Sequence, residues 1–192
     1  MEYIEDILSN FLTSIGLWGY ILSCILIIIE SIIPILPLSL FITLLIYKFG
    51  WFVGFIISYA FTILGSFMSY KIFNSSLRIK FENFIKKKDK VKLNKLCFRL
   101  RTISFEKLCI IIALPFTPQF LINIAAGLAN MSKKKYLYAI IIGKIFLVIF
   151  WGFIGTSLIN SIKNPINILY IIILLSICFI ISRIVNKKEG LE

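Results

Sequence analysis

The sequence predicts an all-α polytopic membrane protein, built from two proline-broken hairpins that each precede a spanning helix. Hydrophobic residues make up 59% of the 192 positions, whereas soluble domains are roughly 45–50% apolar. Long uncharged runs recur along the chain, several of them near the length needed to cross a bilayer. Two of these runs carry a Pro-x-x-Pro pair in their interior. Together these patterns favour one small membrane domain with interrupted helices.

The N-terminal segment, residues 1–14, is acidic and lacks the positive region of a signal peptide, so we expect no cleavage. The chain has no histidine, and its cysteines are isolated from one another. Metal binding is therefore not expected, and no cofactor is. No serine nucleophile with a histidine, no glycine-rich phosphate loop and no carboxylate pair suited to acid–base chemistry is present. We accordingly expect no enzyme activity.

The first broken segment contains "ESIIPILPLSL", in which Pro34 and Pro37 interrupt an apolar run. A proline removes a backbone donor and clashes with the preceding helical turn. We predict a hairpin over residues 15–48, followed by a spanning helix over 51–72. A single kinked helix over 15–48 is the alternative, because the charge pattern does not exclude it.

The connector, residues 74–107, carries eleven Lys or Arg residues against three acids. The positive-inside rule places such a segment in the cytoplasm, and this explanation is preferred to nucleic-acid binding in so small a membrane protein. Its apolar residues recur at helical spacing and predict amphipathic helices on the anionic inner leaflet. These residues are Phe81, Phe84, Ile85, Leu93, Leu96, Cys97 and Leu100. For residues 86–92 a solvated basic loop is an equal alternative.

The second broken segment, residues 108–132, contains "ALPFTPQF" with Pro115 and Pro118. If it crossed the membrane, the three lysines at 133–135 would face outside, opposite the basic connector. A re-entrant hairpin returns them to the cytoplasm, in agreement with the positive-inside rule. A spanning helix over 136–158 then leads outward, and a C-terminal helix over 166–184 returns. The two hairpins are thus expected to enter from opposite sides.

Interrupted hydrophobic segments in corresponding positions of two halves indicate a transporter-type binding site. We expect Pro37 and Pro118 to begin the returning half-helices, with Ser39 in the first turn of one and Thr117 as N-cap of the other. Helix N-termini carry partial positive charge and free N–H groups, which suit an anionic headgroup. The expected substrate-binding residues are Pro34, Pro37, Ser39, Pro115, Thr117, Pro118 and Asn123.

Several single residues have two readings each. Glu30 lies in an apolar run, where acids are usually functional; the alternative is a shallow, hydrated carboxylate. Lys144 is expected to act with Glu30 in transport or proton coupling, or else to extend to the headgroups. Asn123 either contacts substrate or joins helices. Close packing of helices is the expected role of Gly127, Gly143, Gly152 and Gly155.

Two stretches resemble the signature regions of the DedA/VTT-domain superfamily, also called SNARE-associated Golgi proteins, and within it the bacterial VTT branch. They are "ESIIPILPLSLFITLLIYKFGWFVGFIISYAFTILGSFMSYKI" (30–72) and "ALPFTPQFLINIAAGLANMSKKKYLYAIIIGKIFLVIFWGFIG" (113–155). The resemblance covers about residues 15–160. It implies opposed re-entrant hairpins whose tips meet at mid-membrane, and movement of phospholipids or polyprenyl-phosphate carriers between leaflets, with proton coupling proposed for some members. DedA proteins usually carry an arginine shortly before the second proline pair. Here Ile110, Ile111 and Ile112 occupy that neighbourhood, and Lys144 is the nearest substitute.

The leading function is therefore a flippase- or scramblase-type transporter of an anionic lipid or polyprenyl phosphate, with protons as a candidate coupling ion. The expected location is a bacterial plasma membrane, without nucleic-acid partners; homo-oligomerisation stays open. One alternative is a structural or assembly protein of the membrane, and another is a small-ion or proton-linked transporter. A lateral opening lined by Glu30 and Lys144 favours lipid, whereas a sealed, dry interior favours the structural role.

Overall fold

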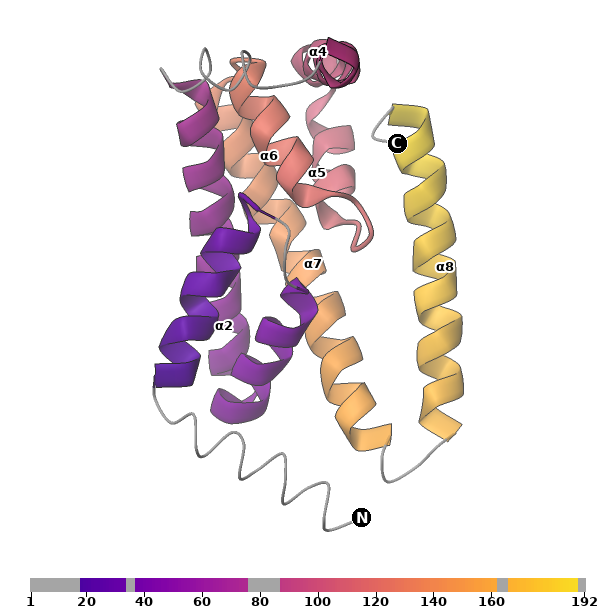
Figure 1. Cartoon of the computed structure of the whole chain (residues 1–192). Coiled ribbons are helices and arrows are strands. Elements are labelled where there is room, and N and C mark those ends of the chain that lie inside the picture. The colour runs from indigo at the N-terminus through magenta and orange to yellow at the C-terminus, as the bar shows by residue number, and fades with distance from the viewer. Residues whose placement is uncertain (1–17, 34–36, 76–86, 162–165, 190–192) are drawn as a thin grey trace.

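The computed structural model describes residues 18–33, 37–75, 87–161 and 166–189 (Figure 1). Within these ranges the regular structure is helical throughout, with no strand. The helices are Trp18–Glu30, α2 (Leu38–Asn74), α4 (Lys87–Thr102), α5 (Phe105–Ala113), α6 (Gln119–Leu128), α7 (Lys133–Ser161) and α8 (Ile166–Glu189). The acidic segment 1–14, Pro34, and the apolar residues Phe81, Phe84 and Ile85 lie outside the described residues.

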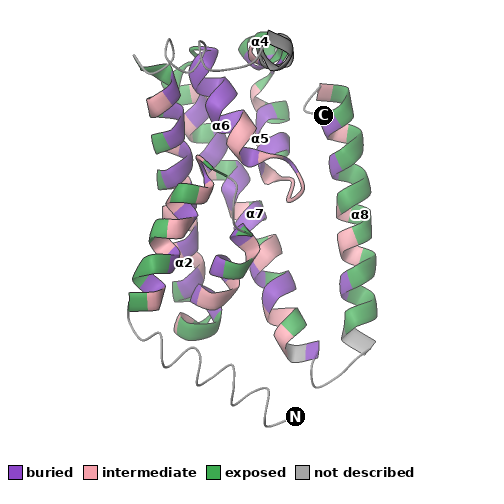
Figure 2. Ribbon diagram, viewed as in Figure 1, coloured by how far each residue is buried: buried purple, intermediate pink, exposed green. Residues whose placement is uncertain are grey.

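Three helices are long and apolar enough to cross a membrane: Leu38–Asn74, Lys133–Ile159 and Ile168–Glu189. Their outer faces carry large exposed apolar side chains, most continuously along α8, which is largely green in Figure 2. An apolar exterior of this kind is typical of a surface solvated by lipid. The predicted all-helical membrane class is confirmed.

A sharp reversal divides α2 into two helices at Gly50. Its φ of 79° and ψ of 166° lie in a region that residues with a Cβ rarely adopt. Beyond the reversal, a Cβ placed on Gly54 would lie 2.6 Å from the carbonyl oxygen of Leu45. The first part of α2 therefore packs backbone to backbone against the second part, which runs in the opposite direction.

The helix Trp18–Glu30 pairs with the first part of α2. The ring of Tyr20, near the start of one helix, lies 5.2 Å from the ring of Phe49, at the end of the other. At its far end, Ile28 packs against Gly65, where an added Cβ would lie 2.9 Å from the Ile28 Cα. The two short helices are thus antiparallel and share the lower half of the bundle in Figure 1.

A second pair of short helices, α5 and α6, occupies the upper half of Figure 1. Ser104 caps α5 by accepting a hydrogen bond from the backbone N–H of Lys107 at 3.4 Å. The helix α5 packs on α7, where a Cβ on Gly143 would lie 2.8 Å from Cβ of Ile112. The helix α6 packs on α2, where a Cβ on Gly127 would lie 2.6 Å from the carbonyl oxygen of Tyr70. Each half of the chain thus supplies one broken helix pair.

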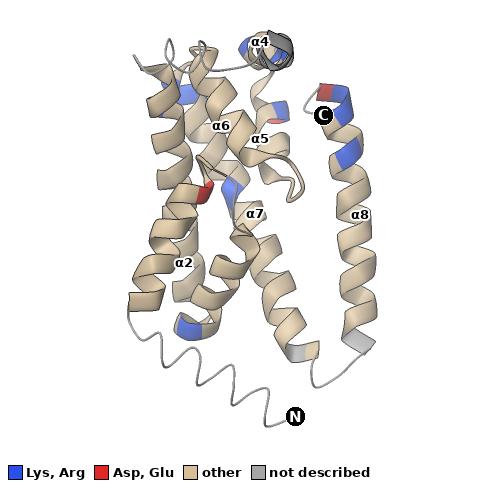
Figure 3. Cartoon of the chain, viewed as in Figure 1, with Lys and Arg blue, Asp and Glu red and all other residues tan. Residues whose placement is uncertain are grey.

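The helix α4 crosses the end of the bundle and is seen nearly end-on at the top of Figure 1. Its start at Lys87 makes the solvated-loop alternative wrong for residues 87–92. The C-terminal end of α8 is tied to the same end of the bundle, because the Arg99 guanidinium donates to the carbonyl of Lys188 at 2.7 Å. The start of α7 lies there too, since the Lys135 ammonium donates to the carbonyl of Ile103. Figure 3 shows basic residues gathered at this end, as the charge argument predicted.

The buried core has two main clusters, one for each half of the bundle. The cluster nearer α4 joins α2, α5, α6 and α7 through Tyr70, Leu108, Ile122, Tyr136 and Ile140. The other cluster joins the first hairpin to the lower part of α7 through Ile42, Leu45, Ile46, Leu147 and Val148. The long helix α7 contributes to both clusters and so holds the two hairpins in one bundle.

The close approach at Gly54 leads to a first prediction. Gly54→Ala is expected to destabilise the protein, because the new Cβ meets the backbone of Leu45 and Ile46, which cannot move independently. Overpacking of this kind costs about 1–3 kcal/mol. Gly152→Ala is the matched control, since its new Cβ would clash only with the flexible end of the Ile46 side chain, while Trp51 and Ile42 lie at ordinary contact distance. Thermal unfolding in detergent should give a clearly lower midpoint for Gly54→Ala; equal midpoints would contradict the rigid contact.

Candidate functional site

The candidate site lies where the interrupted ends of the two helix pairs meet. The amide of Asn123, in α6, donates to the carbonyl of Ser31 at 3.0 Å, just beyond the helix Trp18–Glu30. The hydroxyl of Tyr136, in α7, donates to the Asn123 side-chain oxygen at 2.6 Å. Asn123 is only 1% exposed. One buried amide therefore joins the two pairs of short helices and the long helix α7.

Two tyrosine rings hold the Asn123 amide in position, on the side that faces α4. Tyr136 stacks on Tyr70 with ring centroids 4.7 Å apart. The hydroxyl of Tyr70 donates in turn to the carbonyl of Met131 at 2.6 Å, at the turn between α6 and α7. Sequence reasoning missed Tyr136; its position four residues after the expected end of the second hairpin was the only local signal.

The two charged residues expected in the membrane core are brought together. Lys144, near the middle of α7, is 1% exposed, so its side chain lies inside the bundle and does not extend to the surface. Glu30, at the end of the helix Trp18–Glu30, is half-buried. Their charges interact electrostatically. In Figure 3, red and blue ribbon lie near each other at mid-height of the bundle, away from the charged ends.

Hydroxyl groups line one side of α2 in the same region. Ser58, Thr62, Ser66 and Ser69 are all buried and repeat at a spacing of three or four residues. Thr62 donates to the carbonyl of Tyr59 at 2.9 Å, whereas the other three hydroxyls have no hydrogen-bond partner among the described residues. Sequence reasoning missed this polar stripe, although its helical spacing within the predicted span was visible. The interior of the bundle is therefore more polar than the apolar composition of the chain suggests.

The break in the second helix pair is covered by α8. Asn186 donates to the carbonyl of Phe116 at 3.2 Å and accepts from the hydroxyl of Thr117 at 3.1 Å. The ring of Phe116 packs edge-on against Phe179 at 5.5 Å. Asn186 lies beyond the predicted C-terminal span and was missed, although a buried asparagine in an apolar helix is itself a signal.

These contacts correct the expected helix starts by one residue. Pro118 is the N-cap of α6, whose first residue is Gln119, and no side chain caps this helix. Thr117 is not the N-cap, because Pro118 occupies that position; the Thr117 hydroxyl donates to the side-chain oxygen of Asn186 instead. Likewise Pro37 precedes the first residue of α2, and Ser39 lies in the first turn as expected. Both prolines end the break rather than begin the helix.

Gln119 satisfies the backbone on the other side of the break. Its amide nitrogen donates to the carbonyl of Ile112 at 3.1 Å, near the end of α5, and to that of Leu114 at 3.4 Å. The Leu114 carbonyl also accepts from the backbone N–H of Thr117. Pro115 lies between these groups and is half-buried. The interruption is thus stabilised by specific side chains, as irregular backbone must be when it is shielded from water.

The four glycines expected at packing positions all lie at close approaches. Gly127 faces the backbone of Tyr70, and Gly143 faces Ile112, as described above. On the lower part of α7, Gly152 faces the side chain of Ile46 and Gly155 faces that of Thr43. These contacts set α7 against both hairpins, and so fix the depth at which Lys144 meets Glu30.

Comparison with known proteins gives one family and one relative. The family model of the VTT domain matches residues 33–157. The chain is 26% identical over 183 residues to a protein described as "Uncharacterized membrane protein YhjE" from Bacillus subtilis (strain 168). That alignment covers 95% of this chain and 87% of the relative. No solved structure matches this chain.

Proposed function

The chain belongs to the VTT domain family, and on this premise we propose that it moves an anionic lipid between the two leaflets of a bacterial plasma membrane. The substrate class is an anionic phospholipid or a polyprenyl phosphate. The observation that carries this proposal is the buried cation Lys144, held beside Glu30 where two interrupted helix pairs meet. Buried charges in a membrane protein are costly and mark substrate or ion pathways.

The proposal includes two re-entrant hairpins of opposite orientation. At 1.5 Å per residue, the helix Trp18–Glu30 is about 20 Å long, and α5 and α6 are each about 15 Å long. None of them reaches across a hydrocarbon core of about 30 Å. Each pair would therefore enter the bilayer, break near its middle and return to the side from which it came.

This arrangement suits a phosphate headgroup. The N-terminus of α6 begins with an uncapped turn next to Pro118, and such an end favours negative charge. Lys144 places a basic side chain inside the bundle. In the proposed cycle Glu30 balances Lys144 while the site is empty, and the phosphate replaces Glu30 when lipid enters. Protonation of the displaced carboxylate would couple transport to a proton gradient.

A second candidate function is a proton-linked ion transporter without a lipid substrate. It is favoured by the stripe of Ser58, Ser66 and Ser69, whose buried hydroxyls could solvate a small ion or a proton-carrying water chain. The same stripe would also solvate a headgroup, so the choice depends on what crosses the membrane.

Leaflet-resolved transport in proteoliposomes tests the proposal. The purified chain is reconstituted with a trace of fluorescent phosphatidylglycerol, and the fraction accessible to a membrane-impermeant quencher is followed with and without a proton gradient. Lipid movement above that of empty liposomes supports the proposal. Proton flux without lipid movement supports the ion transporter, and neither activity supports a structural role.

The orientation of the second hairpin gives a second prediction. In a background with all four cysteines replaced, a cysteine at position 134 is expected to resist a membrane-impermeant thiol reagent added outside intact cells. A cysteine at position 164 should react, because the charge pattern places that loop outside. Lysis should expose position 134 and serves as the control. Equal labelling of 134 and 164 in intact cells would exclude the re-entrant second hairpin.

A further inference from the structure

Two lysines from different helices converge on one aromatic ring at the basic end of the bundle. The ammonium nitrogen of Lys71, in the last turn of α2, lies 5.3 Å from the centroid of the Phe67 ring. The ammonium nitrogen of Lys133, the first residue of α7, lies 5.6 Å from the same centroid. Both lysines are exposed, whereas Phe67 is half-buried. The ring therefore brings together two cations that lie far apart in the sequence.

The stacking of Phe67 places both cations over the same face of its ring. Tyr70 lies almost parallel to Phe67, with ring centroids 6.1 Å apart and an interplanar angle of 17°, and so takes up one face. Both ammonium groups lie over the ring and share the other face. Tyr70 in turn stacks on the buried ring of Tyr136. The core thus holds Phe67 from one side, and its free face fixes where the two lysines meet.

The charge around this pair is unbalanced. The neighbouring stretches, residues 68–75 and 131–138, contain four lysines and no acid. An aromatic face attracts cations through its quadrupole but has no net charge, so the two ammonium groups still repel each other. A phosphate between them would relieve the repulsion, because its oxygens accept hydrogen bonds from both ammonium groups. The pair therefore fits a phosphate.

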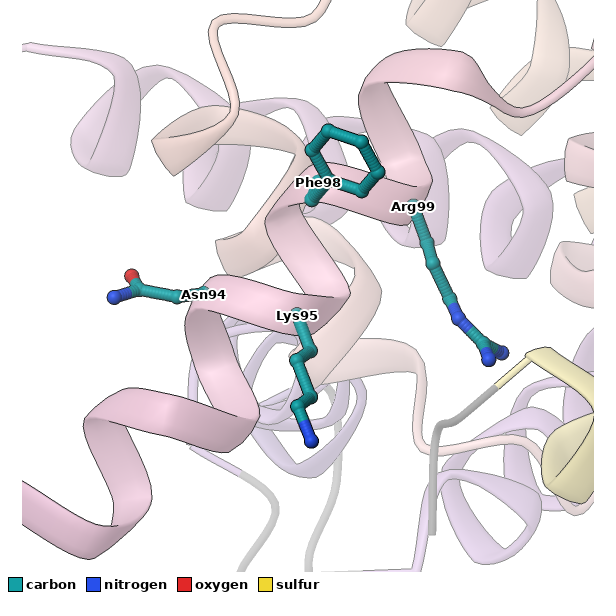
Figure 4. Close-up of a pocket in the computed structure, with 4 residues that line it drawn as sticks. All are labelled: Asn94, Lys95, Phe98 and Arg99. Carbon is teal, nitrogen blue, oxygen red and sulfur yellow. The ribbon is translucent and has the colours of Figure 1, made fainter.

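The cations of α4, at the same end of the bundle, lack this geometry. Asn94, Lys95, Phe98 and Arg99 line an open hollow on that helix alone, and Figure 4 shows Lys95 and Arg99 on one side of α4 and the Phe98 ring on the other. Arg99 also donates to the carbonyl of Lys188. Lys95 is thus an exposed lysine without a ring that gathers a second cation, which makes it a suitable control.

We propose that Lys71 and Lys133 together bind the phosphate of an anionic membrane lipid over the free face of Phe67. The apolar span of α2 ends at Asn74 and that of α7 begins at Lys133. The pair therefore lies at headgroup depth, where basic residues attract anionic lipids. Phe67 lies about one helical turn deeper than Lys71, beside the start of the acyl chains. The inference requires only that α2 and α7 cross the membrane, and not the proposed transport.

The test measures lipid retention by the full chain in detergent with native mass spectrometry. Phosphatidylglycerol and phosphatidylcholine are offered in equal amounts, and inorganic phosphate is offered separately. We expect selective retention of phosphatidylglycerol, reduced about fivefold by Lys71→Gln and by Lys133→Gln, since one basic residue near the membrane surface contributes about this factor. Lys134→Gln and Lys95→Gln remove exposed lysines at the same end of the bundle and should retain the lipid.

A double variant tests whether the two lysines hold one lipid. If Lys71 and Lys133 bind the same phosphate, Lys71→Gln combined with Lys133→Gln should lose no more bound lipids than either single variant. Phe67→Leu keeps an apolar side chain but removes the ring face that gathers the cations, so its retention should fall as well. Its thermal midpoint in detergent is measured alongside, to confirm that the variant is folded.

Three results would overturn the proposal: equal retention of the two lipids by the wild-type protein, full retention by both single lysine variants or by folded Phe67→Leu, and loss of two separate lipids in the double variant. Inorganic phosphate binding that both lysine variants remove, without selective lipid retention, would replace the lipid by a free anion. If the wild-type protein moves no lipid yet retains phosphatidylglycerol through both lysines, the transport proposal fails and this site stands.

Discussion

Glu30→Gln is expected to abolish lipid movement while the protein still reaches the membrane in near-normal amounts. The substitution keeps the size of the side chain and removes only its charge, so the packing of the helix Trp18–Glu30 is preserved. Lys144 then has no negative partner to exchange for the phosphate of the lipid. We expect a loss of at least about tenfold, which corresponds to about 1.4 kcal/mol on the transport barrier.

The design includes the reciprocal change and a surface control. Lys144→Gln should give a similar loss, and the double variant should be no worse than either single one, because residues that act as a unit are not additive. Glu106→Gln makes the same chemical change at an exposed position on α5 and should transport normally. Wild-type transport and pH dependence in Glu30→Gln would reduce the carboxylate to a hydrated group without function.

Pro118→Ala is expected to lower transport more than abundance. Alanine restores a backbone donor at the residue that separates the break from α6. The change loosens a geometry in which Asn186 holds the carbonyl of Phe116 and Asn123 holds that of Ser31. Pro115→Ala combined with Pro118→Ala should disturb the topology as well. A continuous helix over 105–128 would be about 36 Å long and could cross the membrane.

The measurement is transport normalised to inserted protein, together with labelling at position 134. In the double variant a straightened helix would carry the lysines at 133–135 to the far side, so external labelling should rise there. Pro165→Ala, between α7 and α8 in the sequence, removes a proline outside both pairs and serves as control. Full transport by the double variant would refute the idea that the interrupted backbone forms the site.

Local signals in the sequence predicted much of the architecture. Proline interrupts the helical turn in which it stands, so the two Pro-x-x-Pro pairs located both helix interruptions without tertiary information. The positive-inside rule predicted that the lysines at 133–135 lie on the same side as the basic connector. In the structure the start of α7 and the helix α4 do lie at the same end of the bundle. Even Gly50, which breaks α2, coincides with the gap left between the predicted hairpin and span.

Contacts between distant segments could not be predicted in the same way. Thr117 is a good N-cap by local preference, yet its hydroxyl pairs with Asn186, which is 69 residues away. The partner of Asn123 is a backbone carbonyl, which every residue possesses, so no side-chain pattern could identify Ser31. Such pairings follow from the packing of α7 and α8 against the hairpins.

The hydrogen bond between Asn123 and Ser31 has a consequence for the order of biosynthesis. Its partners are 92 residues apart, so at ribosomal speeds of about 5–20 residues per second the donor emerges roughly 5–20 s after the acceptor. Under the proposed topology, the Ser31 carbonyl has entered the bilayer by then, where an unpaired polar group costs several kcal/mol. The first hairpin therefore matures only when the second half of the chain arrives, and both halves complete insertion as one unit.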